Sequence, residues 1–105
     1  MALVKAIFYL PLRDNDGRRL RKEIRETVLE VYRRFHGWTA LGYLSSDCTP
    51  SANWYAPRRN TAYAIILDES RVDELEQVLR DFKNKTTQEA IYLEVQHNIE
   101  FRFVR

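Results

Sequence analysis

The sequence of 105 residues predicts a single α+β domain spanning residues 1–105, with an antiparallel sheet and two helices. Three patterns predict it. Several short segments alternate apolar residues with other residues, as strands do. Two longer segments repeat apolar residues at the spacing of a helix that buries one face. These segments follow one another in the order strand, helix, strand, strand, helix, strand.

The first half of the chain predicts a strand, a helix and a second strand. Residues 3–12 alternate and are rich in β-forming side chains, which predicts the first strand. Residues 18–36 form the predicted helix, because apolar side chains recur on one face: Leu20, Ile24, Val28, Val31, Tyr32 and Phe35. We expect Gly37 to end this helix in a left-handed conformation. Residues 37–47 then predict the second strand.

The third strand and the second helix follow a polar, proline-bearing connection over residues 47–60. Residues 61–69 are rich in Ile, Ala and Tyr and predict the third strand. Ser70 is expected to cap the second helix. The buried stripe of that helix is expected to be Val72, Leu75, Val78, Leu79 and Phe82. We expect the helix to end at Asn84 and the two threonines after it.

The last stretch of the chain alternates over an unusual length. One parity is apolar and consists of Ile91, Leu93, Val95, Ile99, Phe101 and Phe103. The other parity consists of Tyr92, Glu94, Gln96, Glu100 and Arg102. The stretch is either one long strand or a hairpin turning at residues 96–98. The hairpin would place Val95 opposite Ile99 and Leu93 opposite Phe101, with both apolar rows on one face. We favour the hairpin, which adds a fifth, C-terminal strand.

The element order predicts the ferredoxin-like βαββαβ arrangement, in which both helices cover one face of the antiparallel sheet. Two short motifs point the same way. Phe35, Gly37 and Thr39 match an aromatic-Gly-Gly-x-Thr turn in which His36 replaces the first glycine, and Gln88-Glu89-Ala90 matches an entry to the last strand. In these motifs the sequence resembles a group of small bacterial proteins with a ferredoxin-like fold. The resemblance implies that fold and no known activity.

The composition is that of a soluble globular domain, with 45% hydrophobic and 30% charged residues. The single cysteine, Cys48, excludes an internal disulfide and a cysteine-based zinc site made by this chain alone. The apolar run at the N-terminus is too short to cross a bilayer and lacks a signal-peptide cleavage pattern, so we expect a cytoplasmic protein. The net charge of +2 is too small to indicate a nucleic-acid binder by itself.

Residues 14–22 combine an acidic cluster with four cations. Read as a calcium loop with Gly17 at the sixth position, the segment has Leu12 at the first ligand position and a strand in front, so we expect neither a metal nor a cofactor. The acidic cluster instead predicts a turn. The cations Arg18, Arg19, Arg21 and Lys22 oppose the helix dipole, although pairs with Glu23 and Glu26 at i,i+4 would offset this. They form either a solvated basic face or an anion site for phosphate, an RNA backbone or an acidic protein surface.

Two further features suggest contact with a protein partner. The connection between the second and third strands carries Trp54, Tyr55, Arg58 and Arg59, residue types that dominate interface hot spots. Alternatively, Trp54 covers a sheet edge or joins the core.

The second feature is the sheet itself, which is predicted to be apolar on both faces. Ile7, Tyr9 and Ile66 lie on the parity opposite to Phe8 and Ile65. Because the helices can cover only one face, we expect a second copy or another protein to cover the other. The third strand lacks the motif with which RNA-recognition domains stack bases.

The sequence therefore predicts a non-catalytic protein-interaction or oligomerisation module, and most simply a homodimer. Binding of nucleic acid or another polyanion at the basic start of the first helix is one alternative. A cofactor-free enzyme is another, since Cys48 with His36 or His97 could serve as nucleophile and base, although no local signature brings them together.

Overall fold

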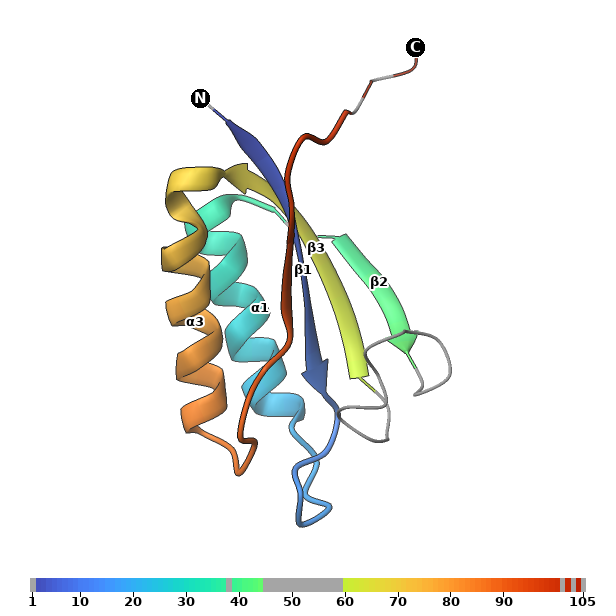
Figure 1. Cartoon of the computed structure of the whole chain (residues 1–105). Helices are drawn as coiled ribbons and strands as arrows, with labels where there is room; N and C mark the ends of the chain where they lie inside the picture. The colour runs from blue at the N-terminus through green and yellow to red at the C-terminus, as the bar shows by residue number, and fades with distance from the viewer. Residues whose placement is uncertain (1, 38, 45–59, 101, 103, 105) are drawn as a thin grey trace.

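The computed structural model describes residues 2–37, 39–44, 60–100, 102 and 104. The elements in chain order are β1 (Leu3–Pro11), α1 (Arg21–Phe35), β2 (Thr39–Leu44), β3 (Asn60–Asp68), the 3-10 helix η1 (Glu69–Arg71), α3 (Val72–Asn84) and β4 (Leu93–Gln96). The strands form one antiparallel sheet in the order β2-β3-β1-β4. Both helices lie on one face of this sheet (Figure 1). The predicted α+β class is confirmed.

This arrangement is consistent with part of a ferredoxin-like fold. The central strand β1 pairs with β3 on one side and with β4 on the other, and β2 pairs with β3. The connection between β2 and β3 lies outside the described residues. The complete βαββαβ order therefore stays a prediction.

The core lies between the sheet and the helices, on the parity that the sequence predicts. Val4, Ala6, Phe8 and Leu10 of β1 are all buried, whereas the residues between them are only half-buried. Phe8 is paired with Tyr63 of β3, and their rings stack with centroids 5.5 Å apart. This alternation follows from strand geometry, because successive side chains point to opposite faces.

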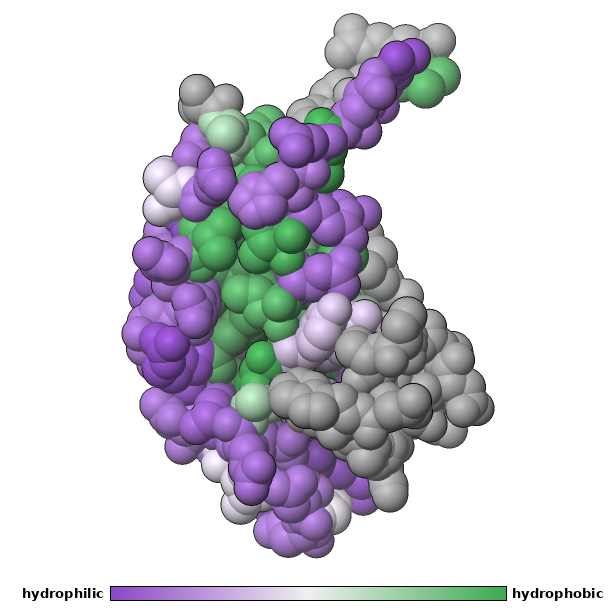
Figure 2. All heavy atoms as spheres, in the orientation of Figure 1, coloured by the Kyte–Doolittle hydropathy of each residue, from purple (hydrophilic) through white to green (hydrophobic). Residues whose placement is uncertain are grey.

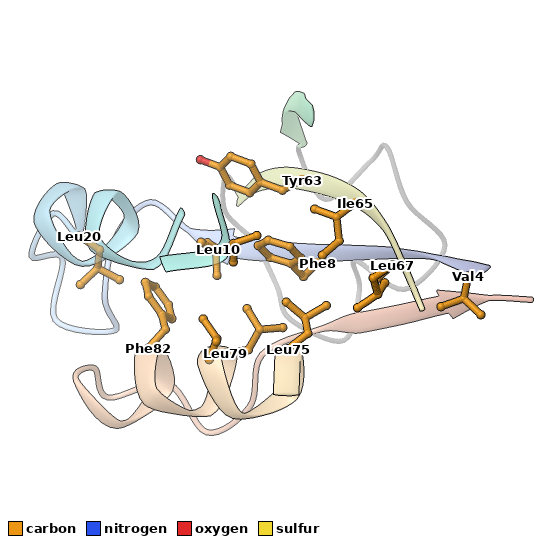
Figure 3. Close-up of a cluster of buried hydrophobic side chains, with 13 residues drawn as sticks. Val4, Phe8, Leu10, Leu20, Tyr63, Ile65, Leu67, Leu75, Leu79 and Phe82 are labelled. Atoms are coloured by element: carbon orange, nitrogen blue, oxygen red, sulfur yellow. The ribbon is translucent and has the colours of Figure 1, made fainter. Parts of the chain in front are cut away.

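The helices supply the other half of the core. Leu75, Leu79 and Phe82 lie one turn apart on α3 and are buried against the side chains of β1 (Figure 3). Leu20 and Val31 contribute from the start and the middle of α1. The predicted stripe on the second helix is confirmed, except that Val72 is only partly buried.

The ends of α1 differ from the prediction. The helix begins at Arg21 rather than at residue 18, because the preceding residues form a tight loop. In this loop the Asp14 N–H donates to the Arg18 carbonyl at 2.8 Å, and Leu20 N–H donates to the Leu12 carbonyl at 2.9 Å. At the other end, His36 adopts the left-handed conformation (φ 63°) that we expected of Gly37.

Ser70 does not cap the second helix as predicted. Asp68 caps the short helix η1 and accepts bonds from the Ser70 N–H at 2.9 Å and from the Ser70 hydroxyl at 2.7 Å, whereas the N-cap of α3 is Arg71, which makes no side-chain cap bond. Glu69–Arg71 then form η1, and α3 begins at Val72. The cap still occurs where the sequence changes from strand to helix pattern.

The C-terminal hairpin is not formed in the described part of the chain. The structure describes residues 97–100, 102 and 104, and none of them belongs to a strand. In Figure 1 the red chain continues past the sheet and away from both helices. The predicted fifth strand is therefore absent from these residues. No helix in the described ranges has the length and hydropathy needed to cross a bilayer.

Candidate protein-interaction site

The sheet face turned away from the helices carries a group of half-exposed side chains from three neighbouring strands. The antiparallel register places Ile7 between Ala64 of β3 and Glu94 of β4, and Lys5 between Ile66 and Gln96. We define the open-face patch by its members: Lys5, Ile7, Tyr9, Ile66, Tyr92, Glu94 and Gln96. Among the described elements, the helices cover only the opposite face of the sheet.

Two tyrosines form the aromatic part of the open-face patch. The rings of Tyr9 and Tyr92 stack with centroids 4.5 Å apart and an interplanar angle of 17°. The backbone joins the same two residues, because the Tyr9 N–H donates to the Tyr92 carbonyl at 3.3 Å. Burial raises the pKa of Tyr9, with smaller contributions from Tyr92 and from the negative charge of Glu94. Tyr9 is therefore uncharged at neutral pH, and its ring and that of Tyr92 form one aromatic surface.

Glu94 is the acidic centre of the open-face patch. Its two carboxylate oxygens accept hydrogen bonds from the Gln96 amide at 2.6 Å and from the Tyr92 hydroxyl at 2.8 Å. These bonds, chiefly the one from Gln96, lower the pKa of Glu94 against the opposing effect of burial, and the charge of Lys5 adds to the lowering. Glu94 is thus a fixed negative charge beside a positive one.

The open face is mixed rather than wholly apolar, which corrects part of the prediction. Ile66 is 44% exposed, and Ile7 and Tyr9 are half-buried, so an apolar area is present. Lys5 and Glu94 add charge to it. Ala62 and Ala64 are buried although they lie outside the core cluster. The sequence had shown the polar members through the second parity of the last stretch, but their contacts became visible only with the register.

The predicted anion site at the start of α1 divides into two parts. Arg18 lies outside the helix and is neutralised by Glu23 at 2.8 Å and by Asp14 at 3.4 Å. Arg19, Arg21 and Lys22 are exposed and have no ion-pair partner among the described residues. The predicted i,i+4 pairs are wrong, because Glu23 binds Arg18 and Glu26 binds Lys85 at 3.7 Å.

Asp14, in the acidic cluster considered above as a calcium loop, joins the β1–α1 loop to the α3–β4 loop. The carboxylate of Asp14 is 1% exposed and accepts hydrogen bonds from the amide and the hydroxyl of Thr87, from the Asn15 N–H and from the Gln88 side chain. Burial alone would raise the pKa of Asp14, but these hydrogen bonds outweigh it and lower the pKa to about 2. All its oxygens are therefore already occupied by protein donors.

Gly17 allows the turn in this loop. Its φ of 89° lies in the left-handed region, and its N–H donates to the Asp14 carbonyl at 2.9 Å. Arg13 closes the loop by donating to the Gly17 carbonyl at 3.0 Å. The predicted turn is confirmed. In the described ranges, no three His, Cys, Asp or Glu side chains come close enough to hold a metal ion.

The remaining predicted residues lie apart or outside the described ranges. Trp54, Tyr55, Arg58, Arg59 and Cys48 fall in residues 45–59, outside the described chain. His36 ends α1, where its N–H donates to the Tyr32 carbonyl. His97 follows β4, with Nδ1 3.4 Å from a carboxylate oxygen of Glu69. His36 and His97 thus lie in different parts of the fold, one at the end of α1 and the other beside Glu69 of η1.

Comparison with family models, with curated proteins and with solved structures found no match to this chain. The resemblance to small bacterial proteins of ferredoxin-like fold therefore stays a prediction. Two surfaces of the described chain bear on function: the open-face patch and the basic start of α1.

Proposed function

We propose that this protein is a non-catalytic interaction module that dimerises through the open-face patch, on a complete ferredoxin-like βαββαβ domain. One observation carries the proposal. The face that no helix covers presents an exposed Ile66 beside Ile7 and the stacked pair of Tyr9 and Tyr92. Aliphatic and aromatic groups in one patch are typical of protein interfaces.

A second copy is the partner that the charges of the patch favour. Lys5 and Glu94 lie on the same face, on neighbouring strands. A twofold axis through the patch would set Lys5 of one copy near Glu94 of the other, so that each charge meets its opposite. The apolar members between them would be removed from water at the same time.

Light scattering on a single substitution tests the proposal. Ile66→Lys puts a second positive charge beside Lys5 in the proposed interface, and we expect the molar mass in solution to fall by half. The matched control is Leu29→Lys on α1, because Leu29 is also an exposed aliphatic side chain (55%) but lies on the helical side. An unchanged mass for Ile66→Lys, or an equal fall for Leu29→Lys, would show that the open face is not the interface.

Polyanion binding at the start of α1 is a second candidate, supported by three cations that no described carboxylate pairs with. Arg19, Arg21 and Lys22 are exposed within four positions of one another. We expect retention on heparin that falls as salt rises and is lost in the Arg19→Gln/Arg21→Gln/Lys22→Gln variant. The control is Arg33→Gln/Arg80→Gln, which removes cations already paired with Glu30 and Glu76. Retention that is independent of salt would remove this candidate.

A further inference from the structure

Among the described residues, β4 is an edge of the sheet. In this part of the chain it pairs with β1 alone, and it is only four residues long. The Tyr9 N–H donates to the Tyr92 carbonyl. The register makes Glu94 and Gln96 the next residues whose backbone groups face β1, opposite Ile7 and Lys5. In an antiparallel strand, alternate residues direct their backbone groups to opposite neighbours. The N–H and C=O groups of Leu93 and Val95 are therefore directed outward, away from β1.

The outer side of β4 is also apolar on its helical flank. Ile91, Leu93 and Val95 are only partly buried against the core, as is Val72 of α3. Figure 2 shows the corresponding apolar strip on the surface, between α3 and β4. The strand carries neither proline nor lysine, which are common means of blocking an edge. A further strand can therefore add at this edge and cover the strip.

The segment that follows β4 has the pattern of such a strand but does not form one here. By sequence, Ile99, Phe101 and Phe103 alternate with polar residues up to position 102. The described residues of this segment lie in no strand, and Val104 is 95% exposed. In Figure 1 the described residues after β4 lead away from both helices. Ile99, the described member of the apolar row, lies in no strand.

We propose that two copies of the chain pair through this edge, with residues 99–103 of each copy adding as a strand to β4 of the other. Antiparallel pairing about a twofold axis through His97 places Ile99 of one copy opposite Val95 of the other. The same register places Phe101 opposite Leu93 and Phe103 opposite Ile91. The three apolar residues of the incoming segment then cover the strip between β4 and α3.

The register is the one that a hairpin within a single chain would have. A hairpin turning at residues 96–98 makes the same pairs in cis that the open form makes between copies. Exchange of an identical element between copies keeps these contacts and only straightens the hinge, which makes it an accessible route to a dimer. Gln96, His97 and Asn98 include no glycine, although Asn98 adopts a left-handed φ of 56°. In Figure 1 the described residues after β4 lead away from both helices. The open form is the one that the structure presents.

The polar parity of the two strands is compatible with this pairing. Tyr92 is placed opposite Arg102 of the other copy, where a guanidinium can lie against the aromatic ring. Glu94 is placed opposite Glu100 of the other copy, and each of these two carboxylates has a cation near it in its own chain. Lys5 lies near Glu94, and Arg102 binds Glu100 at 2.6 Å. The pair of like charges is thereby offset by neighbours that the chain already holds.

Disulfide trapping distinguishes pairing between copies from a hairpin within one. In a Cys48→Ser background, Glu94→Cys/Glu100→Cys puts two thiols at opposed positions whose backbone groups are not hydrogen-bonded to each other, where a disulfide can close. We expect mild oxidation to give a covalent dimer on a non-reducing gel. A disulfide within the single chain, or none, would overturn the proposal. The control pair, Asn84→Cys/Glu100→Cys, places one thiol at the end of α3, and we expect no dimer from it.

Molar mass separates this edge contact from the open-face contact, on which it does not depend. Ile99→Pro removes a backbone N–H from the proposed ladder, whereas Ile99→Val keeps it. If both contacts exist, the wild type contains four chains, and Ile99→Pro and Ile66→Lys each leave two.

The failures of the two proposals differ. If only the edge pairs, the wild type contains two chains, Ile66→Lys keeps two and Ile99→Pro leaves one. If only the open face pairs, the wild type contains two chains, Ile66→Lys leaves one and Ile99→Pro keeps two. This result overturns the edge proposal. A wild type of one chain overturns both, and so does a four-chain assembly that neither variant reduces.

Discussion

Thr87 donates both its backbone N–H and its hydroxyl to the carboxylate of Asp14, across 73 positions of the chain. This contact fastens the loop between β1 and α1 to the loop between α3 and β4. Asn15 reinforces it by donating to the Thr87 carbonyl at 2.8 Å. The two loops therefore hold the start of α1 and the end of α3 in place beneath the sheet.

The buried carboxylate of Asp14 makes the stability of the fold depend on pH. Its pKa is about 2 in the folded protein, below the 3.8 that is usual for an aspartate side chain. The stabilisation is therefore complete above pH 3.8 and is lost as the pH falls towards 2. We expect it to amount to about 2 kcal/mol of the free energy of unfolding.

Urea unfolding of Asp14→Asn checks this expectation. The variant loses the charge, so its stability should vary less with pH between 4 and 2 than that of the wild type. Asp16→Asn is the control, because Asp16 is exposed and accepts one hydrogen bond from the Arg18 N–H. A pH dependence that survives in Asp14→Asn would assign it to another group.

Thr87→Val isolates the hydroxyl of the same contact. Valine keeps the shape of the side chain and the backbone N–H but leaves one donation to the buried Asp14 unmade. Loss of a hydrogen bond to a buried charged group costs about 1 to 3 kcal/mol, and this is the expected fall in the free energy of unfolding. Thr86→Val serves for comparison, since its hydroxyl donates to the neutral Lys83 carbonyl at 2.8 Å. Thr86→Val should lower the free energy of unfolding by less than Thr87→Val does.

Arg71 connects the end of α1 to the start of α3. Its guanidinium lies 4.4 Å from the centroid of the Phe35 ring, donates to Glu74 at 3.0 Å and donates to the Arg34 carbonyl at 2.9 Å. We expect Arg71→Ala to lower the stability by about 1 kcal/mol, because the group is partly exposed. Arg71→Lys should recover only part of this, since an ammonium cannot make the two hydrogen bonds in the same plane. Equal stability of Arg71→Lys and the wild type would count against the geometry.

Phe82 is the largest fully buried side chain that α3 supplies to the core. Phe82→Ala leaves a cavity between α3 and β1, and we expect a loss of about 3 to 5 kcal/mol, measured by thermal or urea unfolding. Tyr32→Ala on α1 is the comparison, because Tyr32 is 59% exposed and its removal opens no cavity. A small loss for Phe82→Ala would mean that the core is less tightly packed than the structure indicates.

Some of the loop chemistry could be predicted from the sequence and some could not. The turn at residues 14–17 was predictable, because Asp, Asn and Gly favour turns by local geometry. The roles of the neighbouring charges were not. Glu23 was expected to bind Arg19 on the helix, but the helix begins later, and Arg18 reaches Glu23 from the loop instead. That outcome depends on how the loop closes against Thr87, a residue remote in sequence.

The candidate interface shows the same division. The alternation in β1 and β3 indicated a sheet with apolar residues on both faces, and Ile66 and Tyr9 are indeed on the face away from the helices. The sequence could not show that Tyr92 stacks on Tyr9 or that Gln96 and Tyr92 hold Glu94, because these contacts depend on which strand lies beside β1.

By itself, the sequence predicted the type of the elements from β1 to β4 and the buried side of β1 and α3. Repeats of 2 and 3.6 residues are set by backbone geometry within a segment, and burial of the apolar row follows from the hydrophobic effect. Only the tertiary structure decided the partner of Asp14, the neighbour of each edge strand and the open course of the chain after β4. These depend on distances between remote segments, which the packing of the whole domain fixes and no local pattern encodes.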